Sequence, residues 1–343
     1  MQGAVCLAPG NRSGALDRSG GVPVKRLIAV LLTCGLAAFE AHAGCTAAAT
    51  AGPAGFGTVS SSLVYSTAQS TSITNAGLTC TPAGIELFNS AYFKATITST
   101  QSGLVGPTGD VITYTIYPGS NNAHPITRGV AFDFTSFGLL GHNAPAAIPL
   151  YFTTVVNNVA AGVYSETLKV QWDWYYCTGL GVGNLCIGSD SGVGKISLLT
   201  VNMTVANDCT ITAANIGFGS APVVSAFTPV SQTVSLACTK GSAYTVGFGD
   251  GLYPLAAGGR RRMISGSNYL AYDIFKSAGT TRWGSVGAAR RASSTAEINP
   301  GNGLGHNPGS GSQIFNYNAR IYTDQSTPPV GAYTDSVLLD VAF

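Results

Sequence analysis

Six cysteines hold most of the potential chemistry in the region that follows an N-terminal export signal. They are Cys45, Cys80, Cys177, Cys186, Cys209 and Cys238. An even number of cysteines in an exported chain predicts disulfides. Six allow fifteen connectivities. The similar separations of Cys45 from Cys80 and Cys209 from Cys238, and the Gly-rich segment between Cys177 and Cys186, favour those three pairs. A zinc site is not indicated, because there is no Cys-x-x-Cys motif and no histidine nearby.

No motif indicates an enzyme. The histidines after the export signal are His124, His142 and His306, and none has the context of a nucleophile elbow or a metal ligand. Residues 190–195 lack the spacing of a P-loop, and residues 301–305 lack the strand–helix setting that a dinucleotide needs. Carboxylates are sparse, and no two stand out as an acid–base pair. We expect a non-enzymatic protein without cofactor or metal; a hydrolase with an unrecognised site is the enzymatic alternative.

Residues 1–43 predict an export signal. A basic pair at 25–26 precedes the apolar run 27–39, and an A-x-A cleavage site at 41–43 precedes Gly44. The run is too short to span a membrane. Residues 1–23 resemble no part of a signal, so we expect a non-native or misassigned start, with translation beginning at Val24. Cleavage removes four of 17 basic and two of 15 acidic side chains, which leaves no net charge and no indication of nucleic-acid binding.

The composition is typical of a β-protein. Only 9% of the residues are charged, and glycine occurs 44 times; small and β-branched residues suit sheets and turns better than helices. A length of 343 residues suggests two domains. We place them at 44–205 and 208–343, because each half begins with a cysteine and ends with a Gly-x-Tyr strand, at Gly162 and at Gly331.

Alternating residues predict an all-β fold with strands in both halves. In the first half the predicted strands are 60–66, 92–100, 110–117, 130–134, 162–172 and 195–205. In the second half they are 232–239, 243–249, 269–275, 314–322 and 333–343, with loops at 251–265 and 288–312. Nothing in the second half corresponds to 195–205. The first sandwich should therefore be closed and the second incomplete.

The final strand is the most informative element. Its residues Tyr333, Val337, Leu339, Val341 and Phe343 share one face, as in a strand with one buried side. No turn, cap or polar tail follows them. An open apolar edge is an aggregation hazard, unless another chain supplies the missing strand, as in donor-strand exchange. We expect these five residues to border an acceptor groove.

Several motifs of the second half occur together in a known family. They are the Cys209/Cys238 pair, Tyr-Leu-Ala-Tyr-Asp-Ile-Phe at 269–275, Thr-Thr-Arg-Trp-Gly at 280–284, Asn-Ala-Arg-Ile-Tyr at 318–322 and Gly-Ala-Tyr-Thr-Asp-Ser-Val at 331–337. With these motifs the second half resembles the spore-coat-protein-U-like family, the subunits of archaic, Csu-type chaperone–usher pili. The first half resembles a diverged member. It keeps its cysteine pair, Tyr-Thr-Ile-Tyr at 114–117 and Gly-Val-Tyr at 162–164, but lacks a clear Trp-Gly match.

The resemblance implies two immunoglobulin-like β-sandwiches, of which the C-terminal one is completed by donor-strand complementation. It implies three partners: a periplasmic chaperone, an outer-membrane usher and the donor strand of an adjacent pilin. Cleavage would leave Gly44 directly before Cys45 without a free donor segment. The expected function is therefore that of a tip adhesin on a cell-surface pilus, which attaches to abiotic or host surfaces and supports biofilm formation.

Apolar residues in glycine- or proline-containing loops of the first half are candidates for surface attachment, because exposed apolar patches mark interaction sites. They are Ile85, Leu87, Phe88, Phe137, Leu139, Leu140, Ile148, Leu180, Val182 and Leu185. Their alternative role is to cap the core. The aromatic run 172–176 indicates core packing beside a disulfide, with sugar stacking as the alternative. The arginines at 260–262 and 290–291 indicate solvated loops, with an anion or membrane patch as the alternative.

Two other functions fit the same sequence. One is a minor pilin away from the tip, with no adhesive role. The other is a free secreted protein, carbohydrate-binding or coat-like, whose sheet edge is closed internally. A closing strand drawn from residues 206–224 would favour that second alternative.

Overall fold

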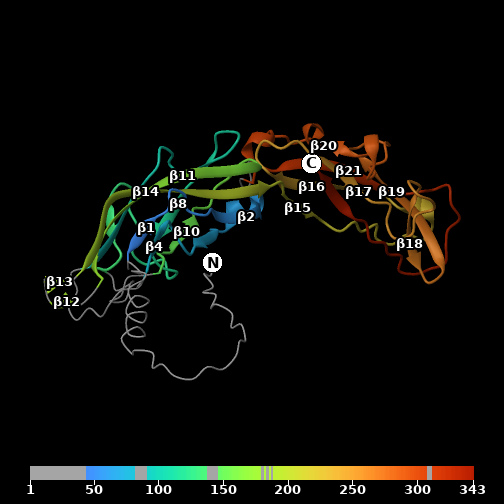
Figure 1. Cartoon of the computed structure of the whole chain (residues 1–343). Coiled ribbons are helices and arrows are strands. Elements are labelled where there is room, and N and C mark those ends of the chain that lie inside the picture. The colour runs from blue at the N-terminus through green and yellow to red at the C-terminus, as the bar shows by residue number, and fades with distance from the viewer. Residues whose placement is uncertain are drawn as a thin grey trace, which may run out of the picture. The chain divides into compact units, whose positions relative to one another are not determined.

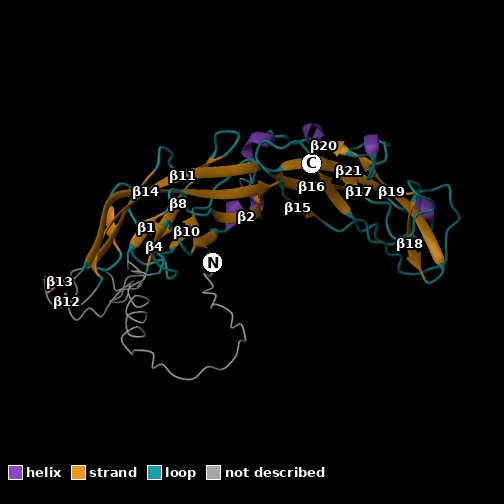
Figure 2. Cartoon of the chain, in the orientation of Figure 1, coloured by secondary structure: helices purple, strands orange, loops and turns teal. Residues whose placement is uncertain are grey.

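The computed structural model describes residues 44–81, 91–136, 146–178, 181–182, 185–186, 188–306 and 311–343. The predicted export signal lies outside the described residues. Strands dominate the described part, with only short helical turns between them (Figure 1, Figure 2). None of the helices in these ranges is long and apolar enough to cross a membrane.

The first domain is built on a large sheet with the strand order β2-β14-β11-β5-β9, and a smaller sheet has the order β3-β10-β8. Within the large sheet, β14 runs antiparallel to β11 and parallel to β2. The elements of this domain are β1 (Cys45–Ala47), β2 (Ala54–Ser60), α2 (Ser61–Ser66), β3 (Ser70–Ile73), β4 (Leu78–Cys80), β5 (Tyr92–Thr98), β6 (Leu104–Val105), β7 (Val111–Ile112), β8 (Tyr114–Tyr117), β9 (Ala131–Asp133), β10 (Leu150–Thr154), β11 (Gly162–Cys177), β12 (Gly181–Val182), β13 (Leu185–Cys186) and β14 (Ser189–Ala206).

The second domain has a sheet with the order β15-β16-β21-β19-β18 and another with the order β20-β17-β22. Its elements are β15 (Cys209–Ala213), η1 (Val224–Ala226), β16 (Val230–Cys238), β17 (Thr245–Phe248), β18 (Arg261–Ser265), β19 (Asn268–Lys276), η2 (Gly287–Ala289), β20 (Arg291–Ala292), η3 (Ser293–Thr295), η4 (Asn302–Leu304), β21 (Gln313–Ile321) and β22 (Leu339–Ala342). The chain is therefore nearly all β, as predicted.

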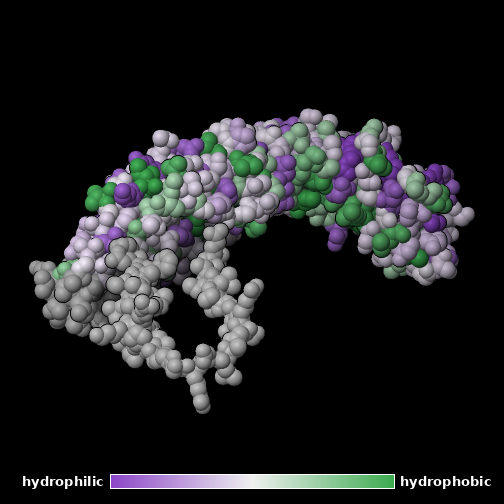
Figure 3. Space-filling model, viewed as in Figure 1, coloured by the Kyte–Doolittle hydropathy of each residue, from purple (hydrophilic) through white to green (hydrophobic). Residues whose placement is uncertain are grey.

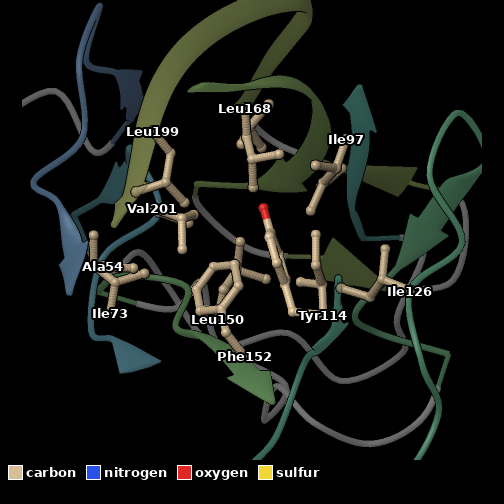
Figure 4. Close-up of a cluster of buried hydrophobic side chains, with 14 of the residues drawn as sticks. Ala54, Ile73, Ile97, Tyr114, Ile126, Leu150, Phe152, Leu168, Leu199 and Val201 are labelled. Atoms are coloured by element: carbon tan, nitrogen blue, oxygen red, sulfur yellow. The ribbon is translucent and has the colours of Figure 1, made fainter. Parts of the chain in front are cut away.

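Each domain buries its own apolar cluster. In the first domain, alternate residues of β14 are buried, among them Leu199 and Val201. They point into the same cluster as Leu168 of β11 and Leu150 and Phe152 of β10 (Figure 4). Full burial of such a side chain contributes roughly 1.5–3 kcal/mol, so β14 contributes substantially to the first core.

The aromatic run belongs to that core. Trp172, Trp174 and Tyr176 are buried on one face of β11, while Tyr175 stacks on Tyr92 with ring centroids 6.2 Å apart. Core packing, rather than sugar stacking, was the correct interpretation of the two tryptophans.

All three predicted disulfides are formed. Cys45 lies opposite Cys80 in the β1–β4 ladder, and Cys209 lies opposite Cys238 in the β15–β16 ladder. Both domains therefore open with the same cross-linked strand pair.

Two further hydrogen bonds recur in the same order in both domains. The Tyr164 hydroxyl donates to the carbonyl of Ala160, and the Tyr333 hydroxyl donates to the carbonyl of Pro329, each at 2.7 Å. Each tyrosine bonds four residues upstream, which is the geometry of a tyrosine corner at the start of a sandwich strand. The segment from Gly331 onward is therefore the counterpart of β11.

A buried tyrosine–carboxylate bond follows two residues later. The Tyr114 hydroxyl donates to Glu166 at 2.5 Å, and the Tyr272 hydroxyl donates to Asp335 at 2.8 Å. Glu166 also accepts from Arg128 at 2.9 Å. Burial by itself would raise the pKa of the Glu166 carboxyl, but the bonds from Arg128 and Tyr114 hold it below its usual range.

Some predicted elements were wrong. Residues 61–66 form helix α2 instead of a strand, because the Ser60 side chain accepts from the Leu63 N–H and caps a helical turn. The predicted loop 251–265 contains β18. In the predicted strand 333–343, only Leu339–Ala342 forms a regular ladder.

Replacing Glu166 with glutamine should lower the free energy of unfolding by roughly 1.5–3 kcal/mol at pH 7, the contribution of hydrogen bonds to a charged group. Because the folded-state pKa of Glu166 is depressed, its contribution is complete above the ordinary glutamate pKa and disappears as the pH falls through the folded value. Urea unfolding across acidic pH should show a weaker pH dependence in E166Q. The control Tyr114→Phe keeps the charge pair and should retain the pH dependence; equal pH profiles for wild type and E166Q would contradict the assignment.

Candidate functional site

Strand β11 and the segment 331–343 have the same alternation but differ in burial. Four inward residues of β11 are fully buried: Tyr164, Leu168, Val170 and Trp172. Their counterparts pack against the second core and remain partly exposed: Tyr333, Val337, Leu339 and Val341. Phe343, at the end of the series, is 51% exposed. The inward face of the final segment is therefore only partly covered.

The difference lies in the neighbouring strand. In the first domain β14 pairs with β11 from Gly162–Val205 to Cys177–Ser189. Among the described residues, β22 pairs with β17 and with no second strand. Residues 206–224 do not close this edge, because β15 pairs with β16 and no strand of that segment pairs with β22. The strand that would favour an internally closed protein is therefore not found in the described part of the chain.

A groove lined by both apolar and polar groups lies beside the final segment. It consists of two adjoining cavities of about 630 and 530 Å³, which share the lining residues Ile216, Phe218, Met263 and Tyr333. One wall comes from the segment after β15 and the other from residues 327–339, while core side chains such as Phe248 form part of the lining. Figure 3 shows apolar surface interspersed with polar surface on the face that it draws.

The first domain shows what fits between such walls. There β14 lies between β11 and β2, with Val201 opposite both Glu166 and Ala54. Strand β2 follows the first cysteine strand, as the segment containing Ile216 and Phe218 follows β15. The groove thus occupies, in the second domain, the position that β14 fills in the first.

Polar contacts hold the final segment, residues 331–343, in place. Arg290 pairs with Asp340 at 2.6 Å and donates to the Thr245 carbonyl at 2.8 Å. Asp335 accepts from the Leu252 N–H at 2.9 Å as well as from Tyr272. Burial, followed by the bond to Asp335, raises the pKa of the Tyr272 hydroxyl, which therefore stays protonated as a donor.

Most of the predicted loop arginines have structural roles. Arg261 is fully buried, pairs with Asp273 and donates to the Phe248 carbonyl at the end of β17. Arg291 is buried and pairs with Glu297. Both interpretations of these residues, a solvated loop and an anion patch, were wrong, because their guanidinium groups bond carbonyl and carboxylate oxygens of the fold.

One residue predicted to take part in surface attachment lies in the core instead. Ile148 is fully buried in the first core, because its segment is tied inward by the hydrogen bond from the Ala76 N–H to its carbonyl. Residues 182 and 185 are backbone pairing partners in the short β12–β13 ladder, which does not test an adhesive role for Val182 or Leu185. The other candidates lie outside the described residues: Ile85, Leu87, Phe88, Phe137, Leu139, Leu140 and Leu180. Their adhesive role stays a prediction.

One serine–histidine pair has the residue types of an activated nucleophile and its base. The Ser61 hydroxyl lies 2.8 Å from His306 Nε2 and 2.6 Å from the Thr239 hydroxyl. All three residues are buried, and burial lowers the pKa of His306. The buried pair connects α2 of the first domain with a loop of the second and serves as a packing contact. Within the ranges the structure covers, no three His, Cys, Asp or Glu residues gather as a metal site would require.

Sequence reasoning missed the far wall of the groove. Ile216, Phe218 and Met263 were not selected, although Ile-Gly-Phe at 216–218 places two large apolar residues at strand spacing in a glycine-rich segment. That spacing is the signal that could have found them.

Comparison with known proteins agrees with this architecture. The family model of the Spore Coat Protein U domain matches residues 32–171 and again 195–340. No curated protein sequence matches the chain.

Solved structures give one informative likeness. The chaperone–tip adhesion subunit pre-assembly complex CsuC–CsuE, from archaic chaperone–usher Csu pili of Acinetobacter baumannii, is 29% identical with a TM-score of 0.62, over 87% of this chain and 100% of the matched chain. The CupB6 tip adhesin of Pseudomonas aeruginosa is 13% identical with a TM-score of 0.25, over 80% and 86% of the two chains, which is too low to add weight. With two matches that together span most of its length, the chain belongs to the Spore Coat Protein U domain family.

Proposed function

We propose that this chain is a non-enzymatic subunit of a chaperone–usher pilus whose second domain accepts a strand from an adjacent pilin. The observation that carries the proposal is the partly exposed apolar face of Tyr333, Val337 and Leu339 beside a groove, where the first domain holds β14. Passage through the periplasm with a chaperone, assembly at an outer-membrane usher and display on a surface pilus follow from that role.

The groove defines the chemistry of its donor. By analogy with β14, the donor runs antiparallel to residues 331–343 and bonds their free main-chain groups. Met203, Val201 and Leu199 of β14 lie opposite Tyr164, Glu166 and Leu168. The donor therefore needs apolar residues at every second position, opposite Tyr333, Asp335 and Val337. Each fully buried side chain adds roughly 1.5–3 kcal/mol, which is large against a domain stability of about 5–15 kcal/mol.

We place the subunit at the tip, with the first domain as the adhesive part. Strand β14 already fills the first domain, so the first domain needs no donor of its own. The similarity to CsuE, described as a tip adhesion subunit, supports this position. The apolar loops around 85–88, 137–140 and 180–185 would contact an abiotic or host surface and so support biofilm formation.

The acceptor role predicts dependence on a partner. Residues 44–343 expressed in the periplasm should be soluble only with the cognate chaperone. Transfer to a synthetic donor peptide from the neighbouring subunit should then raise the melting temperature sharply, because the peptide covers the open edge. Differential scanning calorimetry of the two complexes measures this shift. A stable monomer that needs neither partner would overturn the proposal in favour of a free secreted protein.

Two adjacent leucines lie on opposite faces of the final segment, and only one of them borders the groove. Leu339 packs against the second core, whereas Leu338 is 71% exposed. Leu339→Asp should abolish donor-peptide binding, since it places a charge in the groove. The matched control Leu338→Asp should bind the peptide within about twofold of wild type, as surface changes usually have small effects. Displacement of the chaperone from each complex by increasing peptide measures both apparent affinities; equal losses would show that β22 does not border the donor.

The adhesive role predicts a phenotype without loss of assembly. Replacing Phe137, Leu139 and Leu140 with serine should reduce bacterial attachment to a hydrophobic surface while pilus number stays unchanged. The control Val193→Ser removes an apolar side chain that is 75% exposed on β14 and should attach like wild type. Attachment is counted in flow, and pili are counted by electron microscopy. Undiminished attachment of the triple variant would exclude this loop as the adhesive contact.

A further inference from the structure

Asp190 is a carboxylate without a cationic partner at the start of β14. Its Oδ2 accepts from the Cys45 N–H and from the Trp174 indole N–H, each at 2.8 Å. None of the ion pairs among the described residues includes it. Its Oδ1 accepts no hydrogen bond from the part of the chain that the structure covers. One oxygen of this carboxylate is therefore available.

The available oxygen faces Gly44. A methyl group added to the Cα of Gly44 would lie 3.7 Å from Asp190 Oδ1. Gly44 is also fixed in position: its N–H donates to the Thr81 hydroxyl at 2.8 Å, and its carbonyl accepts from the Thr81 N–H at 3.0 Å. The neighbouring Cys45–Cys80 disulfide cross-links the same two strands. Gly44 is thus held beside Asp190 by contacts that do not involve the carboxylate.

Removal of the export signal changes the chemistry of that nitrogen. In the precursor it is an amide with a single hydrogen, which the Thr81 hydroxyl already accepts. Hydrolysis of the Ala43–Gly44 bond consumes one water, leaves a carboxylate on Ala43 and gives Gly44 an α-ammonium group. The new group has three hydrogens and a positive charge, and two hydrogens remain for other acceptors.

We propose that Asp190 is the binding site for the α-ammonium of processed Gly44, an ion pair that exists only after signal cleavage. Charge-assisted bonds of this kind are shorter and stronger than those between neutral groups. The pair fastens the new N-terminus to β14 and to the strand pair of the first disulfide. The inference does not depend on the groove of the second domain. If that groove accepts a strand, the fastened N-terminus cannot act as a donor, which agrees with a position at the tip.

The reactivity of the α-amine tests the proposal. The mature chain is purified with its chaperone, its N-terminus is sequenced, and it is treated with limiting acetic anhydride at pH 7. Mass spectrometry of the N-terminal peptide then gives the acetylation rate. A neighbouring carboxylate favours the unreactive ammonium form, and a change of one unit in the amine pKa is a tenfold change in reactive amine. We expect about tenfold slower acetylation in wild type than in Asp190→Asn.

Two further variants make the result decisive. A chain that retains Ala43 keeps Asp190 but moves the amine one residue away, and it should react as fast as D190N. If D190N does not fold, the acetylation rate of wild type is compared with that of the Ala43 chain alone. Asp173→Asn, which alters another β11–β14 carboxylate that accepts from the Gly194 N–H, should react like wild type. Equal rates for wild type and the Ala43 chain, or a mature N-terminus other than Gly44, would overturn the proposal.

Discussion

The structure of the second domain depends on the need to cover an open sheet edge. Main-chain N–H and C=O groups along such an edge have no hydrogen-bond partners, and the inward side chains beside it lack the contacts of a neighbouring strand. The segment 331–343 has both deficits, since its pairing continues on one side only and its apolar face is partly exposed. In the proposed acceptor role, such an edge stays soluble only while another chain covers it, so solubility and assembly depend on the same contact.

A comparison of the two domains shows which strand is missing, because both have the same arrangement of elements. Both open with a disulfide between opposed strands, both have a tyrosine corner, and both bury a tyrosine–carboxylate bond. They differ in β14, which the first domain contains and the second does not. The contacts of Arg290 and Asp335 keep the final segment in position without that neighbour. The groove is therefore preformed, and a donor would not have to order it at its own cost in entropy.

Local patterns predicted the parts of this architecture that depend on local chemistry. The cysteine pairs, the burial of Trp172 and Trp174 and the alternation of the final strand all follow from spacing. The helical turn at 61–66 was missed, because a single capping hydrogen bond outweighs the strand propensity of a short segment. Arg261 and Ile148 were misjudged, because charge and loop position do not reveal which buried carboxylate or core a distant segment provides. The far wall at Ile216 and Phe218 depends on the same long-range packing.

The position of strand β14 determines how the chain bears mechanical tension. It ends at Ala206, and β15 begins at Cys209, so only two residues separate the longest strand of the first domain from the second domain. Tension that reaches the second domain from the opposite end of β14 runs along the strand axis. It loads the hydrogen bonds to β11 and β2 in shear, so that many bonds must break together rather than one after another. Beyond the linker, the Cys209–Cys238 bond passes the load covalently to β16. The connection between the domains is thus arranged to resist pulling forces, as the proposed adhesive role would require under flow.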